Sequence, residues 1–269
     1  MKVDVLGSGS RGNAIVVDGQ DGQGCLLVDC GFAPRVLASR MKLAGVVPEE
    51  VCGVILTHEH HDHISGLERA CRRWHWPVAA TSGTVVESGG AVHASHRLTR
   101  AKPLHLAGLT IEAMRTPHDA AESVGFILTH DRSGCRLAIV YDLGHWTANM
   151  ACRLQGLDAI VVESNHDEEM LRFGPYPEFL KARVAGPKGH LSNADASELA
   201  RTISHRGLRT IVLAHLSETN NTPGLVLGAM RRALRGSAFK GQIGVARQDS
   251  PIQFTIGPSG RAHQLALGL

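Results

Sequence analysis

The sequence has few aromatic residues and no long apolar run. Among its 269 residues are only 2 Tyr, 6 Phe and 3 Trp. No stretch approaches the roughly 20 apolar residues of a membrane-spanning helix, so we do not expect an integral membrane protein. The first residues, MKVDVLGSGS, lack the apolar core of a secretory signal peptide. We therefore expect a cytoplasmic protein that does not bind membranes.

Closely spaced cysteine pairs and a strong net charge are also absent. The six cysteines form no C-x-x-C pair, which predicts buried free thiols in a reducing compartment. The formal net charge of +3 neither demands nor excludes a nucleic-acid partner. Arginines cluster in two places, which we interpret as solvated helix faces. These are Arg69, Arg72 and Arg73, and Arg231, Arg232 and Arg235.

The apolar patterning predicts an α/β fold. The first third contains short runs separated by Gly-rich turns, followed by a helix from Pro34 to Ala44. Later runs are apolar at every position, as expected for strands that are covered on both faces. The short early runs are Lys2–Leu6, Ala14–Val17 and Cys25–Val28, and the later runs are Val54–Leu56, Leu137–Val140, Ala159–Val162 and Ile211–Ala214.

Helical segments alternate with these later runs. They lie near Ser65–Arg73, Thr147–Leu154, Pro177–Val184, Asn193–His205 and Pro223–Arg235. This order predicts two mixed sheets with helices outside them, a four-layer α/β/β/α sandwich. Because no repeat or long linker interrupts the chain, we expect residues 1–269 to form a single domain.

Histidine is abundant, and chemically active residues follow the buried runs. The chain has 16 His. Each later run is followed by side chains that bind metals or transfer protons, and these include His58, Asp142, Glu163 and His215. Since the carboxyl ends of buried strands deliver residues to a common edge, we expect these side chains to meet there.

The densest motif is the run His58-Glu59-His60-His61-Asp62-His63, directly after the Val54–Leu56 run. Imidazole and carboxylate groups are suitable ligands for Zn²⁺, Mn²⁺ or Fe. A loop that folds back would place His58 and His60 on one ion and Asp62 and His63 on a second ion. A solvated turn would not need four imidazoles and a carboxylate in so few positions.

This motif resembles the H-x-H-x-D-H signature of the metallo-β-lactamase-fold hydrolases. The resemblance implies that His118 completes the first ion's ligands, that His215 completes the second ion's ligands, and that Asp142 is shared between both ions. It also implies two divalent metal ions per chain, with zinc favoured and manganese or iron as alternatives. The implied ligand set is His58, His60, Asp62, His63, His118, Asp142 and His215.

Two further motifs narrow the resemblance to one branch of that family. Gly189–Asn193 reads GHLSN and Glu163–Asp167 reads ESNHD. Both are similar to the YycJ/WalJ-like branch, single-domain relatives of the nucleases RNase Z and RNase J. Tyr141 and His61 depart from the usual residues at their positions, although neither is an expected ligand.

From these segments we predict the groups around the metals. His190 precedes a predicted helix capped by Ser192 or Asn193, where free backbone N–H groups favour a phosphate oxygen. Helix capping by His190 itself is the alternative. The predicted substrate-binding residues are His190, Ser192, Asn193 and Asn221, and Glu163 and His166 are predicted to support the ligands from behind. Caps and turns account for the two asparagines nearly as well.

The resemblance implies hydrolysis of a nucleic-acid phosphodiester, with DNA favoured, by a hydroxide that bridges the metals. Asp62 and Asp142 would orient the hydroxide, and His190 would assist the leaving group, so these three are the predicted catalytic residues. The sequence has no G-x-S-x-G elbow, which counts against a serine hydrolase. Too few residues remain for a β-CASP cap, and the open site that results suits an exonuclease.

Two alternatives use the same residues for other functions. Hydrolysis of a thioester, lactone or other small molecule would need only the same metal centre, as in glyoxalase II or a lactonase. A metal-binding redox protein is the non-enzyme alternative. Few aromatic side chains are available to stack on bases, so we do not expect sequence-specific recognition of a single strand.

Overall fold

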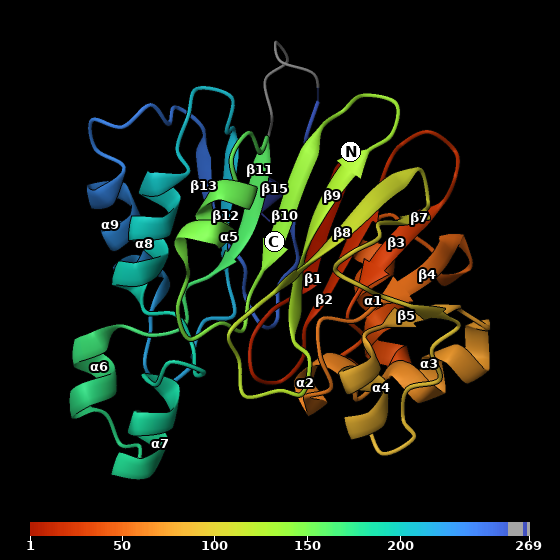
Figure 1. Cartoon of the computed structure of the whole chain (residues 1–269), viewed down its shortest axis with the longest axis horizontal. Helices are drawn as coiled ribbons and strands as arrows, with labels where there is room; N and C mark the ends of the chain where they lie inside the picture. The colour runs from red at the N-terminus through yellow and green to blue at the C-terminus, as the bar shows by residue number, and fades with distance from the viewer. Residues whose placement is uncertain (258–265, 268–269) are drawn as a thin grey trace.

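The computed structural model describes residues 1–257 and 266–267. In this part of the chain the strands form one eight-stranded and one seven-stranded sheet, packed face to face (Figure 1). The eight-stranded sheet has the order β15 (Ala266–Leu267), β14 (Ile252–Thr255), β1 (Lys2–Gly7), β2 (Ala14–Asp18), β3 (Cys25–Val28), β4 (Val51–Ile55), β5 (Val78–Ala80) and β6 (His96–Arg97). The seven-stranded sheet has the order β13 (Gln242–Val245), β12 (Thr210–Ala214), β11 (Ala159–Glu163), β10 (Arg136–Val140), β9 (Val124–His130), β8 (Leu109–Arg115) and β7 (Leu104–Leu106).

Both sheets are mixed, and helices lie on their outer faces (Figure 1). Helices of the first half follow strands of the eight-stranded sheet: α1 (Pro34–Leu43), the 3₁₀ helix η1 (Pro48–Glu50), α2 (His61–Ile64), α3 (Leu67–Trp74) and α4 (Ser82–Glu87). Those of the second half are α5 (Ala148–Arg153), α6 (Glu168–Phe173), α7 (Glu178–Val184), α8 (Asn193–Thr202) and α9 (Pro223–Ala233).

Three hydrophobic clusters separate the four layers. Alternate residues of one strand enter different clusters: Leu137 and Ile139 of β10 pack between the sheets, whereas Ala138 and Val140 pack toward α5 and α8. A third cluster fills the space between the eight-stranded sheet and helices α1 and α3. Strands covered on both faces need apolar side chains at every position, which explains the unbroken apolar runs. The predicted α/β/β/α sandwich is confirmed.

Some predicted boundaries were wrong. The helix expected near Ser65–Arg73 is α3, which begins two residues later at Leu67, after Gly66, where an added Cβ would collide with the carbonyl oxygen of Phe32. The helix expected to reach His205 ends at Thr202. Several elements were not predicted, among them β9, which pairs with both β8 and β10.

No helix in the described residues is long and apolar enough to cross a membrane. We expect residues 1–269 to form a single domain, but residues 258–265 and 268–269 lie outside the described residues. The single-domain organisation of the chain therefore stays a prediction.

Candidate metal centre

Three site residues adopt left-handed backbone conformations just beyond strand ends. Asp29 follows β3, Asp142 follows β10 by two residues and His215 follows β12, with φ values of 58°, 54° and 53°. Such a conformation costs a non-glycine residue about 1–3 kcal/mol, and it tends to persist at functional sites. The three turns bring the side chains of Asp29, Asp142 and His215 to the same end of the two packed sheets.

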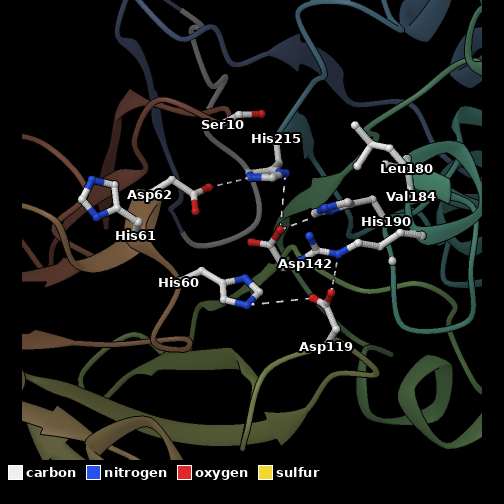
Figure 2. A pocket seen from close by; sticks show the side chains of 12 residues that line it. Ser10, His60, His61, Asp62, Asp119, Asp142, Leu180, Val184, His190 and His215 are labelled. Atoms are coloured by element: carbon white, nitrogen blue, oxygen red, sulfur yellow. Dashed lines mark hydrogen bonds and ion pairs between the residues drawn. The ribbon is translucent and has the colours of Figure 1, made fainter. Parts of the chain in front are cut away.

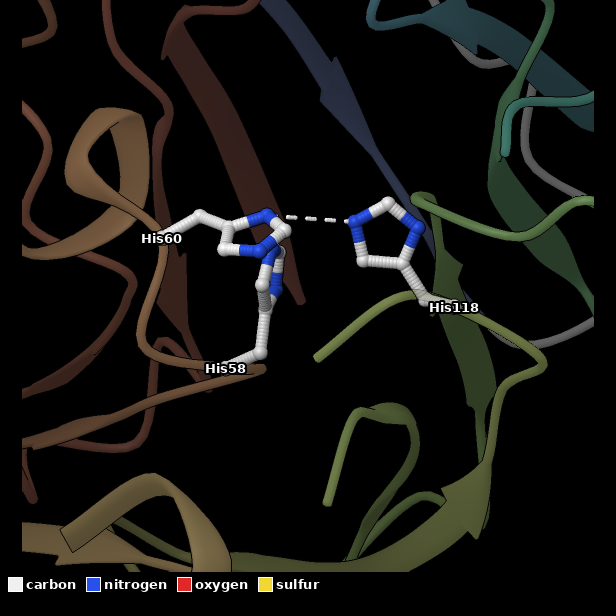
Figure 3. A group of neighbouring side chains, drawn as sticks. All are labelled: His58, His60 and His118. Carbon is white, nitrogen blue, oxygen red and sulfur yellow. Dashed lines mark hydrogen bonds between the residues drawn. The ribbon is translucent and has the colours of Figure 1, made fainter. Parts of the chain in front are cut away.

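The first group contains three histidines, His58, His60 and His118, which converge from two loops (Figure 3). Their candidate ligand atoms all lie within 4.8 Å of one another. Nε2 of His118 is 3.2 Å from Nδ1 of His60, and Nδ1 of His118 lies 3.1 Å from the carbonyl oxygen of Gly189. Because that carbonyl only accepts hydrogen bonds, it fixes the proton on Nδ1 and leaves Nε2 free to bind a metal.

The second group contains Asp62, His63 and His215. Oδ2 of Asp62 is 3.3 Å from Nε2 of His63 and 3.3 Å from Nε2 of His215 (Figure 2). Asn13 donates from Nδ2 to the same carboxylate oxygen at 3.2 Å, which holds it in place.

Asp142 lies between the two groups. Its Oδ2 is 3.0 Å from Nε2 of His63, and its Oδ1 is 3.4 Å from Nδ1 of His215. The set of His58, His63 and Asp142 also has its ligand atoms within 4.8 Å of one another. The structure therefore brings all seven predicted ligands together, and their role as ligands stays a prediction.

The donor set and its electrostatics fit divalent cations. In the described part of the chain no hydrogen-bond partner reaches the buried Nε2 of His58, and burial lowers the pKa of this imidazole well below its usual range. A neutral, unpartnered imidazole nitrogen is a suitable metal ligand.

Neighbouring carboxylates raise the pKa values of two other imidazoles, those of His215 and His63. Burial alone would lower the pKa of His215, but Asp142, Asp62 and Glu163 around it raise the pKa to about 9. Burial is likewise outweighed at His63, whose pKa is raised well above its usual range by Asp62 and Asp142. These carboxylates thus favour positive charge, and metal ions would supply it in place of the protons.

His190 lies beside this cluster and is held by Glu163. Its Nδ1 is 2.8 Å from Oε1 of Glu163 and 3.3 Å from Oδ1 of Asp142. Burial opposes protonation, but the Glu163 charge and hydrogen bonds to both carboxylates raise the pKa of His190 well above its usual range. Nε2, on the opposite edge of the ring, remains for a substrate oxygen. The other carboxylate oxygen of Glu163 accepts from the backbone N–H of Leu143 at 2.9 Å.

A cavity of about 340 Å³ covers the exposed side of the cluster (Figure 2). His60, Asp62, Asp142, His190 and His215 line it, together with residues of α7 and the loop at Ser10. This volume lies within the range of small-molecule pockets. The arrangement therefore exposes ligands and His190 to a common space in which a reacting bond would fit.

Other predicted substrate-binding residues are engaged elsewhere and do not line this cavity. Ser192 is the N-cap of α8 and accepts a hydrogen bond from the backbone of Asp195, as predicted for a capping residue. Asn193 and Asn221 are buried and bond to each other through both amide groups, at 2.9 and 3.0 Å. Ser192 is thus the helix cap, and the amides of the two asparagines are occupied by each other, so substrate binding by any of the three stays a prediction.

His166 is also buried, and its Nδ1 has no hydrogen-bond partner among the described residues. In the part of the chain that the structure describes, its ring forms no hydrogen bond with a carboxylate of the centre, and its backbone carbonyl accepts from the N–H of Asn193 at 2.8 Å. A supporting role for His166 stays a prediction, whereas Glu163 contacts His190 directly.

Sequence analysis missed Asp29, a buried carboxylate that supports His63. Its Oδ2 lies 2.8 Å from Nδ1 of His63 and accepts from Tyr141 Oη at 2.6 Å, while Oδ1 accepts from the backbone N–H of Thr57 at 2.9 Å. A carboxylate on Nδ1 orients the ring and directs Nε2 toward a metal. The available signal was its place directly after the Cys25–Val28 run.

Replacing Asp29 by asparagine should weaken metal binding by about 10–100-fold, because the amide cannot accept from Thr57, Tyr141 and His63 as the carboxylate does. Competition with a chelator of known affinity measures the change. Asp21→Asn is a matched control, since Asp21 pairs at 3.4 Å with His130 outside this cluster. Wild-type metal affinity in Asp29→Asn would show that Asp29 does not support the site.

Comparisons with known proteins place the chain in a family. Residues 25–216 match the beta-lactamase superfamily domain, so the chain belongs to the metallo-β-lactamase-fold hydrolases and is an enzyme of that class. It is 33% identical over 243 residues to the exodeoxyribonuclease YycJ of Bacillus anthracis, covering 87% of this chain and 89% of the relative. This confirms the predicted resemblance and sets aside the redox-protein alternative.

Two further similarities agree with this assignment. The chain is 32% identical over 228 residues to the exodeoxyribonuclease WalJ of Streptococcus pneumoniae serotype 2, covering 82% of this chain and 83% of the relative. The metallo-β-lactamase-fold protein YhfI from Bacillus subtilis superimposes with a TM-score of 0.67 at 20% identity, covering 93% of this chain and 98% of that chain. At this identity the second similarity supports the fold alone.

Proposed function

We propose that this protein is an exodeoxyribonuclease that hydrolyses phosphodiester bonds with two divalent metal ions. The observation that carries the proposal is the convergence of seven imidazole and carboxylate ligands beside His190, which is itself held by Glu163. Two relatives that span more than four fifths of the chain are named exodeoxyribonucleases, which supports DNA as the substrate. We also propose that the protein is cytoplasmic.

In this proposal each ion has its own group of ligands. His58, His60 and His118 would hold one ion, Asp62, His63 and His215 would hold the other, and Asp142 would contact both. The bound ions would supply Lewis acidity and an activated water molecule at neutral pH. Zinc suits this set of imidazole and carboxylate ligands, and manganese or iron would also be accepted.

Two side chains would orient the attacking water and protonate the leaving group. Burial would raise the pKa of Asp62, but His63 and His215 hold it well below its usual range, so this carboxylate is ionised. Asp62 lines the cavity and would orient the attacking water. His190, protonated between Glu163 and Asp142, would donate a proton from Nε2 to the leaving oxygen.

A substrate panel tests the proposal. Oligonucleotides of DNA and RNA, single and double stranded and labelled at either end, are incubated with the protein and Mn²⁺, Zn²⁺ or Mg²⁺ in turn. We expect stepwise release of nucleotides from a DNA end, because the ligands and His190 surround a pocket rather than a long channel. A chromogenic lactam and a glutathione thioester are tested in parallel. Hydrolysis of either one without phosphodiester cleavage would overturn the nuclease proposal.

A further inference from the structure

A second cavity lies directly behind the first histidine group. Its volume is about 670 Å³, larger than the cavity over the ligands, and His118 is part of its lining. The side chains around it come from the loop between β6 and β7, the end of β8 and the loop that follows it, α5 and the loop before it, and the segment before His190. Four of them are cationic, namely Arg100, Arg115, Arg153 and Lys188, and we call this cavity the basic groove.

The positive charge of the basic groove is largely uncompensated. Arg100, Arg115 and Lys188 are exposed, and none of them forms an ion pair with an acidic side chain in the described part of the chain. Arg153 lies 3.5 Å from Glu112, a carboxylate outside the lining. Glu122 is the acidic residue of the lining, and its Oε2 accepts from the backbone N–H of Gly83 at 3.0 Å.

Two arginines on the side of the metal cavity are instead paired with acids. Arg11 pairs with both Glu218 and Asp249, and Arg183 pairs with Asp119 at 2.7 Å. Four cations gathered in one hollow repel each other, and this repulsion is relieved when an anion binds among them. The groove therefore has the charge of a site for a polyanion.

A narrow ridge separates the groove from the metal cavity. The backbone N–H of Asp119 donates to the carbonyl of Lys188 at 3.0 Å, and the His118 ring bonds to the carbonyl of Gly189, so two loops are joined along this ridge. Lys188 faces the groove, whereas Gly189 and His190 line the metal cavity. A strand whose reacting phosphate lies beside His190 would reach the groove after crossing only this ridge.

The chemistry of the lining favours a sugar–phosphate backbone over bases. Thr147 and Asn149 add neutral hydrogen-bonding groups to the four cations, and no Phe, Tyr or Trp is among the lining residues. Bases are usually held by stacking on aromatic rings, whereas phosphates are held by Lys, Arg and neutral donors.

We propose that the basic groove binds the DNA backbone adjoining the reacting bond, independently of base sequence. This rests on the proposed nuclease function and extends it by assigning a second binding surface for the same substrate. The groove would hold the strand in register while its end lies in the metal cavity. It would also make cleavage of long substrates sensitive to salt, because bound counterions are released from each neutralised phosphate.

The test uses the metal-loaded protein and a triple variant, Arg100→Gln, Arg115→Gln and Lys188→Gln. All three side chains are exposed, so their loss leaves the core intact. Steady-state kinetics are measured on a labelled DNA oligonucleotide and on bis(p-nitrophenyl) phosphate, which is too short to reach the groove. The ratio of kcat/KM for the oligonucleotide to that for the small diester should fall about tenfold or more. The slope of log kcat/KM against log salt should fall by about 1 for each lost phosphate contact.

A matched control carries Arg231→Gln, Arg232→Gln and Arg235→Gln at the end of α9. Arg231 and Arg232 form the basic last turn of this helix, which packs beside β13 at one edge of the seven-stranded sheet, whereas the groove lies at the end of β8 toward the other edge (Figure 1). The control should keep the wild-type ratio and salt slope.

Three outcomes would overturn the inference. A triple variant that keeps the wild-type ratio and slope, while the wild type cleaves DNA, would refute the groove and leave the nuclease proposal standing. An equal change in the α9 control would show that general charge, rather than the groove, controls binding. A wild type that cleaves neither phosphodiester would refute the nuclease proposal and the groove with it.

Discussion

Replacing Asp142 by alanine should remove bound metal and hydrolytic activity together. Asp142 is buried, and its two oxygens lie 3.0 Å from His63 and 3.4 Å from His215. It also shares a candidate metal group with His58, so its loss opens both ligand groups at once. Elemental analysis should show about two ions per chain in the wild type, as in two-metal hydrolases, and far less than one in the variant.

A buried carboxylate can also matter for folding, so Asp142→Asn is examined beside Asp142→Ala, with a thermal melt of each metal-free protein. Asp4→Asn is the matched control, since Asp4 is buried and bonds to Gln253 away from the centre. The control should keep its metal. A single ion retained tightly by both Asp142 variants would contradict the shared role of Asp142 and the two-metal site.

Sequence patterning identified the strands whose burial on both faces is visible as an unbroken run of apolar residues. β10, β11 and β12 are covered on both faces, so each contains a run of four apolar residues that is visible without knowledge of the partners. β9 was not predicted, although its apolar stretch Phe126–Leu128 is as long as the predicted Val54–Leu56 run. Pairing with β8 and β10 extends it to Val124–His130, and those partners are set by tertiary structure.

Most ligands were predicted because they follow an apolar run. Asp29 also follows one, after Cys25–Val28, but it was missed because its role depends on a distant partner. Asp29 acts through Tyr141, 112 residues away in sequence. Conversely, Asn193 and Asn221 were assigned to the substrate, but their amides bond to each other across 28 residues. A polar side chain in a loop looks the same in sequence whether it contacts substrate or another side chain.

His190 falls within a candidate metal group with Asp142, Glu163 and His215, but its hydrogen bonds distinguish it from the seven predicted ligands. Its Nδ1 is directed at Glu163 and Asp142, and its side chain is 24% exposed to the metal cavity. The histidines of the first group instead gather around one another, and one of them, His58, has an unpartnered nitrogen. A group that faces carboxylates and solvent is placed to carry a proton rather than to hold a cation.

His190→Ala should therefore keep its metal and lose turnover. We expect kcat to fall by about 10²-fold or more, the usual range for a lost general acid or charge-stabilising group, with metal content near that of the wild type. A diester with an activated leaving group should lose less, because such a group departs without a proton. Metal analysis and kinetics on p-nitrophenyl and alkyl phosphodiesters measure both effects. His105→Ala is the matched control, since His105 is exposed and bonds to Thr110 away from both cavities. If His190→Ala loses metal as completely as Asp142→Ala, then His190 binds or supports the metal, and the division of roles proposed for this site is wrong.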